Sequence, residues 1–184
     1  VSPVRGHPNV QGQRTVGITE KPELAPLDKL EEQYGFAPPR EPGMNTVEAC
    51  EGILAHRVQA FIGLGGNFVR AVPERGLMEA AWRAIPLTVQ VSTKLNRNHL
   101  VHGKASYILP CLGRIEIDRQ AGGPQDVTIE DSTACMHGSR GMAEPVASTL
   151  LSEPAIVAGI AKATLDPNPR VDWDRWVADY ASIR

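Results

Sequence analysis

The chain has 184 residues, of which 42% are hydrophobic and 22% are charged, and its net charge is −2. This composition is typical of a soluble globular protein that buries a core. A charge so close to zero gives no electrostatic basis for binding nucleic acid or an anionic membrane. No apolar run is long enough to span a bilayer, so we expect neither a nucleic-acid partner nor a membrane span.

The first 42 residues are rich in proline and glycine, and they predict an irregular segment with one helix over residues 27–34, closed by Gly35. The chain begins at Val1 and ends at Arg184 within a helical pattern, which suggests a segment of a longer polypeptide. On composition alone the first 13 residues predict a mobile terminus. However, Arg5 and His7 lie there among glycines and amides, a mixture that suits contact with an anion.

The centre of the chain predicts a strand, a glycine turn, a helix and a second strand, over residues 60–64, 65–67, 73–84 and 87–91. A third strand is expected at residues 107–109. Right-handed crossovers would make these strands parallel neighbours. We therefore predict an α/β fold for residues 43–184: a Rossmann-like open sheet, mainly parallel, with flanking helices.

The glycine turn follows the carboxyl end of a predicted parallel strand, the edge where open α/β sheets bind ligands. It lacks the third glycine of the G-x-G-x-x-G motif, because Phe68 stands there, so a tight turn without a ligand fits the pattern equally well. The polar loop over residues 92–96 would lie beside it at the same edge.

Weaker patterns cover the rest of the chain. A capping box of Asn45 and Glu48 predicts a helix reaching about residue 56. Period-two alternation predicts that residues 114–118 and 126–130 pair as antiparallel strands, followed by a polar loop over residues 132–141. Two helices are expected at the end, from Ser152 to about residue 164 and from Asp172 to beyond residue 180, the second with an aromatic stripe of the kind that packs in a core.

The cysteines and histidines do not predict a metal centre. Cys50, Cys111 and Cys135 lie far apart and match no zinc or iron–sulfur spacing. They favour free, mostly buried thiols in a reducing compartment, so we expect a cytoplasmic protein. His99 and His102 form a pair that would share a helical face, but no third ligand accompanies them.

Four stretches together resemble the molybdopterin oxidoreductases: PVRGHPNVQG at 3–12, GLGGN at 63–67, VQVSTKLN at 89–96 and YILP at 107–110. The resemblance is to formate dehydrogenase catalytic subunits, in particular their formate dehydrogenase-like branch, and it covers essentially the whole chain. It implies a Rossmann-like domain that helps to hold bis(molybdopterin guanine dinucleotide) with molybdenum.

The resemblance also implies residue roles. Arg5 and His7 would be the catalytic residues, with Arg5 handling a small anionic substrate such as formate. His7 stands where better-known formate dehydrogenases have glutamine, which bears on whether formate itself is the substrate. Ser106 replaces a frequent aspartate. The implied cofactor-binding residues are Gly6, Asn9, Gln11, Gly12, Gly63, Leu64, Gly65, Gly66, Asn67, Gln90, Ser92, Thr93, Lys94, Asn96 and Ser106.

The family's iron–sulfur cysteines, molybdenum ligand and catalytic histidine would lie upstream of this chain. The resemblance therefore implies that the fragment alone is inactive and works with the rest of a parent polypeptide and an electron-transfer partner. Two alternatives remain open. A stand-alone NAD-type domain would need an acidic residue after the second strand, where the chain instead has Val91 to Lys94. A non-catalytic interaction domain is neither favoured nor excluded.

Overall fold

A computed structural model of the chain describes residues 16–131, 133 and 135–183. The chain divides into two compact units, each described here by itself. The sheet unit comprises residues 44–113 and 149–153. The split unit comprises residues 1–43, 114–148 and 154–184. One boundary therefore falls next to residue 42, where the composition of the chain changes.

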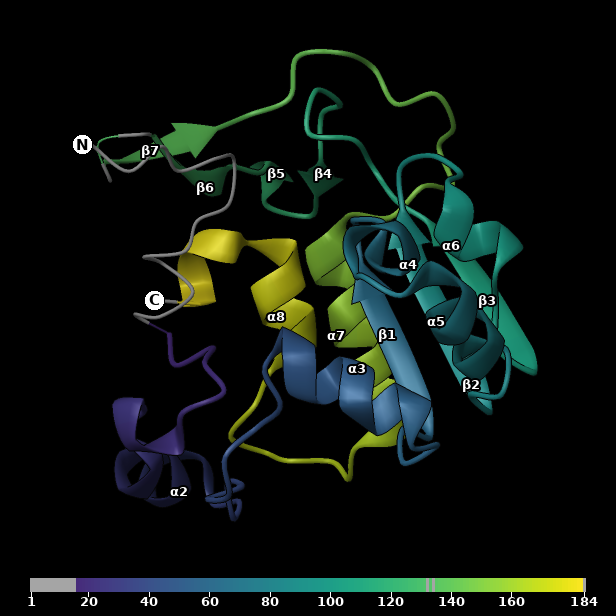
Figure 1. Cartoon of the computed structure of the whole chain (residues 1–184). Coiled ribbons are helices and arrows are strands. Elements are labelled where there is room, and N and C mark those ends of the chain that lie inside the picture. Colours follow the sequence, from purple (N-terminus) through teal and green to yellow (C-terminus); the bar gives the residue numbers. More distant parts are fainter. Residues whose placement is uncertain (1–15, 132, 134, 184) are drawn as a thin grey trace. The chain divides into compact units, whose positions relative to one another are not determined.

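The sheet unit is built on three parallel strands, β1 (Ala60–Leu64), β2 (Leu87–Ser92) and β3 (Ala105–Pro110), in the order β1-β2-β3 (Figure 1). Residue 62 pairs with residue 89, which pairs with residue 107. Short apolar runs separated by helical crossovers produce this arrangement. The predicted α/β fold with a parallel sheet is confirmed.

Four helices belong to the sheet unit: α3 (Thr46–Leu54), α4 (Phe68–Ala71), α5 (Arg75–Trp82) and α6 (Arg97–Leu100). The capping box of α3 is confirmed, because the Asn45 side chain accepts from the backbone N–H of Glu48 and the Glu48 carboxylate accepts from that of Asn45. The predicted helix at 73–84 is shorter than expected. Glu74 has a φ of 55°, a left-handed conformation that delays the start of α5.

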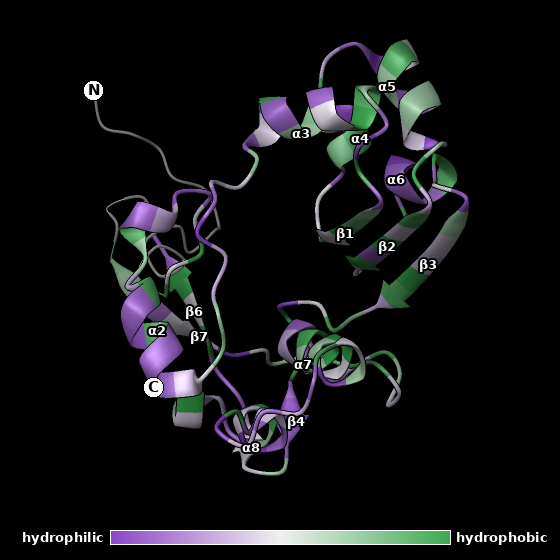
Figure 2. Cartoon of the chain, turned by 90° about the horizontal axis from the view of Figure 1, so that it is seen from below, coloured by the Kyte–Doolittle hydropathy of each residue, from purple (hydrophilic) through white to green (hydrophobic). Residues whose placement is uncertain are grey.

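These four helices lie on one side of the sheet (Figure 2). Between them and the strands, Trp82 is fully buried and its ring centroid lies 4.6 Å from that of Phe61 and 5.7 Å from that of Phe68. The rest of this core is aliphatic and comes mainly from α3, α4 and α5, with Ile53 and Met78 each 1% exposed. This apolar layer fixes the helices against the strands that carry the glycine turn.

The split unit contains short elements: η1 (Pro22–Leu24), α2 (Leu27–Tyr34), β4 (Arg119–Gln120), β5 (Gly123–Pro124), β6 (Val127–Glu130), β7 (Met136–Ser139), most of α7 (Glu153–Thr164), α8 (Trp173–Ala178) and η2 (Tyr180–Ile183). The predicted α2 is confirmed, with Gly35 in the left-handed conformation at its end. Arg170 secures that end by donating to the carbonyl oxygens of Glu32 and Gln33 at 2.9 and 3.2 Å.

The predicted antiparallel pairing of residues 114–118 with residues 126–130 is wrong. Residues 114–118 form no strand, and β6 pairs instead with β7, which lies in the stretch predicted as a polar loop. Between residues 118 and 126 the chain forms the tight β4–β5 hairpin, in which Gln120 pairs with Gly123. Residues 114–118 run beside Gly141, where an added Cβ would lie 1.9 Å from the Glu116 carbonyl oxygen. The alternation of polar and apolar residues thus predicted the strand β6 but not the strand that pairs with it.

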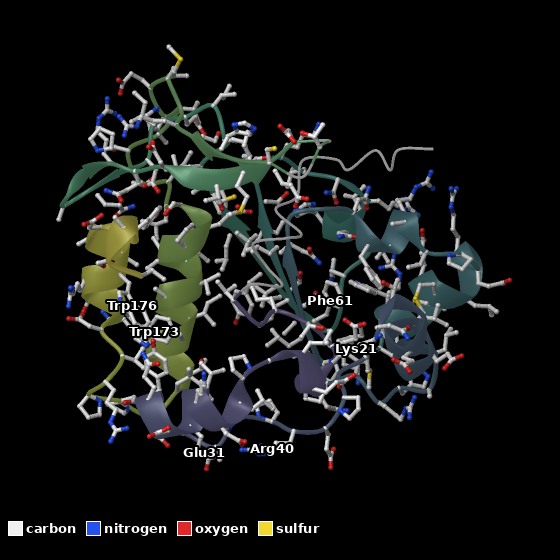
Figure 3. The ribbon with its side chains drawn as sticks, turned by 90° about the vertical axis from the view of Figure 1, so that its left-hand side faces the viewer. Lys21, Glu31, Arg40, Phe61, Trp173 and Trp176 are labelled. Atoms are coloured by element: carbon white, nitrogen blue, oxygen red, sulfur yellow. The ribbon has the colours of Figure 1, made fainter. Side chains whose placement is uncertain are left out.

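Two groups of side chains expected to be mostly buried are more exposed than predicted. The stripe on α8 is not core, since none of its residues is buried; Trp173 and Trp176 are half-buried and meet edge to face, with ring centroids 5.4 Å apart (Figure 3). Among the three free thiols only Cys111 is buried, whereas Cys135 is exposed. Within the described part of the chain, no helix has the length and apolar character to cross a membrane.

Candidate functional site

The glycine turn is open in front and constrained in its backbone. Gly65 and Gly66 have φ values of 71° and 72°, and a Cβ at either position would meet no atom within 4 Å. Glycine is therefore required here by the left-handed backbone, not by crowding. The backbone N–H of Gly65 donates to the Val91 carbonyl oxygen at 2.8 Å, which ties the turn to the end of β2.

Asn96 holds the turn from the neighbouring loop. Its Nδ2 donates to the Gly66 carbonyl oxygen at 2.7 Å, while its Oδ1 accepts from the backbone N–H of Asn98 at 2.9 Å and caps α6. Its own backbone N–H donates to Nδ1 of His99 at 2.8 Å, completing a capping box. One side chain thus joins the loops that follow β1 and β2.

A buried polar layer lies beneath the turn. Gln90 and Asn98 are 2% and 1% exposed, and Asn98 Oδ1 accepts from the backbone N–H of Val69 at 2.9 Å. Asn98 Nδ2 donates weakly to Gln90 Oε1 at 3.5 Å. That oxygen lies 2.4 Å from where a Cβ on Gly63 would stand, so residue 63 must be glycine for Gln90 to lie flat against β1.

Three buried side-chain atoms around this turn have no hydrogen-bond partner among the described residues: Asn67 Oδ1, Gln90 Nε2 and His99 Nε2. Because Nδ1 of His99 accepts a hydrogen bond, the neutral ring carries its proton on Nε2 and presents a donor. Leaving such a group unsatisfied costs about 1–3 kcal/mol. All three atoms are enclosed, so bound water, or a ligand that opens the turn, would supply the missing hydrogen bonds.

The loop after β2 adds polar groups to the same edge. Thr93 and Lys94 are exposed, and Ser92 Oγ donates to the Lys94 carbonyl oxygen at 2.9 Å. Arg97 does not contribute a free charge, since its guanidinium binds Glu79 at 2.8–3.1 Å and lowers the pKa of that carboxyl. Lys94 is an exposed cation in the loop at the same edge of the sheet as the turn.

The structure brings most of the predicted site residues of the sheet unit together, but not all. Ser106 pairs with Thr88 near the amino ends of the strands. Thr88 precedes Ser92 by four residues along β2, which corresponds to about 13 Å of strand. A hollow of about 370 Å³ also lies at the amino ends, lined in part by Gln59, Pro86 and Lys104. Parallel α/β sheets bind ligands at the carboxyl ends, which favours the glycine turn over this hollow.

The predicted residues of the first segment lie outside the described residues: Arg5, Gly6, His7, Asn9, Gln11 and Gly12. Conversely, sequence reasoning missed Asn98 and the role of His99. The spacing of Asn96 and His99 is that of a helix N-cap and its third residue, and this pattern could have indicated the His99 contact. No pattern in the sequence indicates that Asn98 reaches the backbone of α4.

Titratable side chains elsewhere in the described part of the chain form no metal-binding cluster. Within the described residues no cluster of three or more histidine, cysteine, aspartate or glutamate side chains is arranged to hold a metal ion. In the split unit, His137 Nε2 lies 2.8 Å from Asp131 Oδ2 and holds the pKa of that carboxyl below its usual range. This exposed pair joins β7 to the preceding loop.

The sequence matches no protein-family model. It is 50% identical over all 184 residues to protein YdeP of Escherichia coli O6:H1 and 49% identical to protein YdeP of Escherichia coli strain K12. It is 47% identical over its whole length to the uncharacterized oxidoreductase Rv2900c of Mycobacterium tuberculosis strain H37Rv. The chain spans about a quarter of the length of each of these relatives, 24% in every case.

Proposed function

We propose that the chain is a cofactor-binding domain of a longer molybdopterin-dependent oxidoreductase that resembles formate dehydrogenase. Its role is to bind one dinucleotide of bis(molybdopterin guanine dinucleotide) at the glycine turn. The observation that carries this proposal is the left-handed glycine turn at the carboxyl end of a parallel strand, with open space in front of Gly65 and Gly66. Similarity to a relative named an oxidoreductase, over a quarter of its length, supports the class of the whole protein.

The residues present suit a guanine dinucleotide. Lys94 supplies a positive charge for the diphosphate, and the open backbone at Gly66 lets phosphate oxygens approach without meeting a side chain. Asn67 Oδ1 is an acceptor without a partner, and Gln90 Nε2 and His99 Nε2 are donors without one, so the residues beside the turn have hydrogen-bonding capacity to spare. When bound, the molybdenum cofactor supplies two-electron oxidation–reduction, while the protein binds and orients it.

Substrate handling belongs to the same proposal. Arg5 presents a planar, permanently charged guanidinium suited to a small carboxylate such as formate, and His7 is suited to moving a proton near neutral pH. Electrons would pass to a partner group, with an iron–sulfur centre in another part of the longer polypeptide. The fragment itself would be inactive, because it contains none of the metal ligands that the resemblance places upstream.

The test compares two glycines in the full-length protein. Gly66→Asn keeps a residue that tolerates the left-handed backbone but fills the open space in front of the turn. Gly76→Asn is the matched control, because a Cβ there also meets nothing but the residue lies in α5. We expect Gly66→Asn to lower the molybdenum and guanine content of purified protein about tenfold without loss of folded structure, and Gly76→Asn to keep both. Equal cofactor content in the two variants would rule out the turn as the binding site.

A further inference from the structure

His99 caps the first turn of α6 through a ring nitrogen that can change its role. Its Nδ1 accepts from the backbone N–H of Asn96 at 2.8 Å, which closes the capping box of this helix. Glutamate or glutamine usually fills this position of a capping box, and neither changes its charge near neutral pH. Histidine does, so the chain has a titrating group where an acceptor of fixed charge is usual.

Protonation of the ring removes the acceptor. A protonated imidazole donates from both nitrogens, so Nδ1 could no longer accept from Asn96. The Asn96 carbonyl oxygen is a poor replacement partner, because it lies 3.3 Å from Nδ1 and already accepts from the backbone N–H of His99 at 3.1 Å. The other nitrogen, Nε2, is enclosed and has no partner among the described residues. Both nitrogens therefore disfavour a protonated ring in this position.

The surrounding charges do not offset this cost. Titratable or charged side chains on the elements around His99 are those of Lys94, Arg97, His102, Glu79 of α5 and Arg70 of α4, which packs against α6. Within the described part of the chain none of them hydrogen-bonds to the His99 ring. The one carboxylate in this group is bound by Arg97 at 2.8 Å. The group has more cations than anions, so its field also disfavours a positive ring.

Asn96 connects the ring to the glycine turn. Its Nδ2 donates to the Gly66 carbonyl oxygen at 2.7 Å, and its Oδ1 caps α6. If its backbone N–H lost the His99 acceptor, the peptide plane would have to turn to find a partner in water, because an unpaired buried N–H is unfavourable. The same movement displaces the side chain that holds Gly66.

We propose that His99 is a pH-sensitive switch for the glycine turn. The neutral ring holds Asn96 and the turn in place, and protonation releases both. The contribution of the cap is complete where the ring is neutral, and it is lost as the pH falls through the range in which imidazoles titrate. The turn is therefore held more loosely in acid.

The consequence for the cofactor rests on the proposed function, but the switch itself does not. If the turn binds a dinucleotide, that ligand is held less firmly below neutral pH. The measurement below follows the backbone of the turn and needs no cofactor. A switch without molybdenum, or a molybdenum protein without a switch, would each be recognised, so the two proposals fail independently.

The experiment measures amide hydrogen exchange at pH 8 and pH 5.5 in full-length protein from molybdate-starved cells. The amide of Asn96 reports the cap, and the amide of Gly65, which donates to Val91, reports the turn. Each rate is divided by the intrinsic rate at the same pH. We expect both amides to lose protection about fivefold at pH 5.5, the effect of losing one helix cap. His99→Gln keeps an acceptor that does not titrate, so its protection should be the same at both pH values.

Two further variants separate the switch from a general effect of acid. His102→Gln removes the neighbouring histidine, whose Nδ1 contacts a backbone carbonyl oxygen, and it should keep the wild-type pH profile. Asn96→Asp cannot donate to Gly66, so the Gly65 amide should be weakly protected at both pH values while the amide of residue 96 still responds to pH.

Three results would overturn the proposal: equal wild-type protection at the two pH values, a loss of protection in His99→Gln that matches the wild type, or wild-type protection of Gly65 in Asn96→Asp. If His99→Gln does not fold, the other two proteins still decide. A wild-type loss that disappears in His102→Gln would then assign the effect to the wrong histidine and reject the switch.

Discussion

At the residue scale, Asn96 makes three contacts, two through its side-chain amide and one through its backbone N–H. Its Oδ1 caps α6, its Nδ2 binds the Gly66 carbonyl oxygen, and its backbone donates to His99. The turn is thus bonded from the β2 side in two ways, by the backbone bond from Gly65 to Val91 and by the Asn96 side chain. Capping and turn support can be separated by substitution, since only the amide nitrogen reaches Gly66.

We therefore predict different outcomes for Asn96→Ala and Asn96→Asp. Alanine loses the cap and should lower the free energy of unfolding by about 1 kcal/mol. Aspartate keeps a capping oxygen but cannot donate to Gly66, so it should be closer to wild type in stability while losing cofactor as alanine does. Urea denaturation and molybdenum content of the full-length protein measure the two effects. Full cofactor content in Asn96→Asp would mean that the turn does not depend on this bond.

The ion pair between Glu79 and Arg97 gives a prediction about pH. Hydrogen bonding to Arg97 lowers the pKa of Glu79 below its ordinary 4.5. A carboxyl whose pKa falls on folding stabilises the folded state above its unfolded pKa, and this contribution is lost as the pH falls through the folded value. We expect Glu79→Gln to lower the denaturation midpoint at pH 7, and the difference from wild type to shrink as the pH falls below 4.5. A difference that stays constant between pH 7 and pH 3 would show that the pair does not contribute through charge.

At the scale of elements, the packing of β1 against β2 depends on the missing side chain at Gly63. An added Cβ would lie 2.4 Å from Gln90 Oε1 and 3.1 Å from the Phe61 ring. Both neighbours are held, since Gln90 is buried and Phe61 packs on Trp82. The edge strand β1, the central strand β2 and the polar layer beneath the turn therefore pack together with little room to adjust.

Gly63→Ala should destabilise the protein by about 1–3 kcal/mol through overpacking. The matched control is Gly76→Ala, at a position in α5 where a Cβ meets nothing, and it should stabilise by up to about 1 kcal/mol. Denaturation midpoints of both variants give the comparison. If Gly63→Ala is as stable as its control, Gln90 moves aside freely and the polar layer is not rigid.

The elements also show how far the sequence could predict the fold. The three strands follow from apolar runs, and α2 and α3 follow from their capping residues, so these were predicted correctly. The four-residue α4 was missed because one turn of helix leaves no periodicity to detect. The pairing of β6 with β7 was missed because a period of two identifies a strand but not its neighbour.

The candidate site was predictable only in part. The glycines of the turn and the loop after β2 stand out in sequence, and the structure brings them to one edge of the sheet. The inward-facing groups could not be predicted, because the burial of Asn98 and the unpartnered Nε2 of His99 depend on how α6 packs over β2. The predicted roles of Arg5 and His7 remain predictions, since both lie outside the described residues.

At the scale of the whole molecule, the chain forms two units and matches a quarter of the length of its relatives. The glycine turn and the three unpartnered buried atoms beside it lie in the sheet unit. No group in the described part of the chain bonds these three atoms. The proposed function assigns the turn to a dinucleotide and leaves the rest of the cofactor to the longer protein.

The proposed molybdopterin guanine dinucleotide cofactor is tested most directly by elemental analysis of the purified full-length protein for molybdenum, together with the guanine nucleotide released from it by acid hydrolysis. We expect both, with a guanine-to-molybdenum ratio of about two for a bis(dinucleotide) cofactor. Protein purified from molybdenum-replete cells that contains neither molybdenum nor releasable guanine would contradict it.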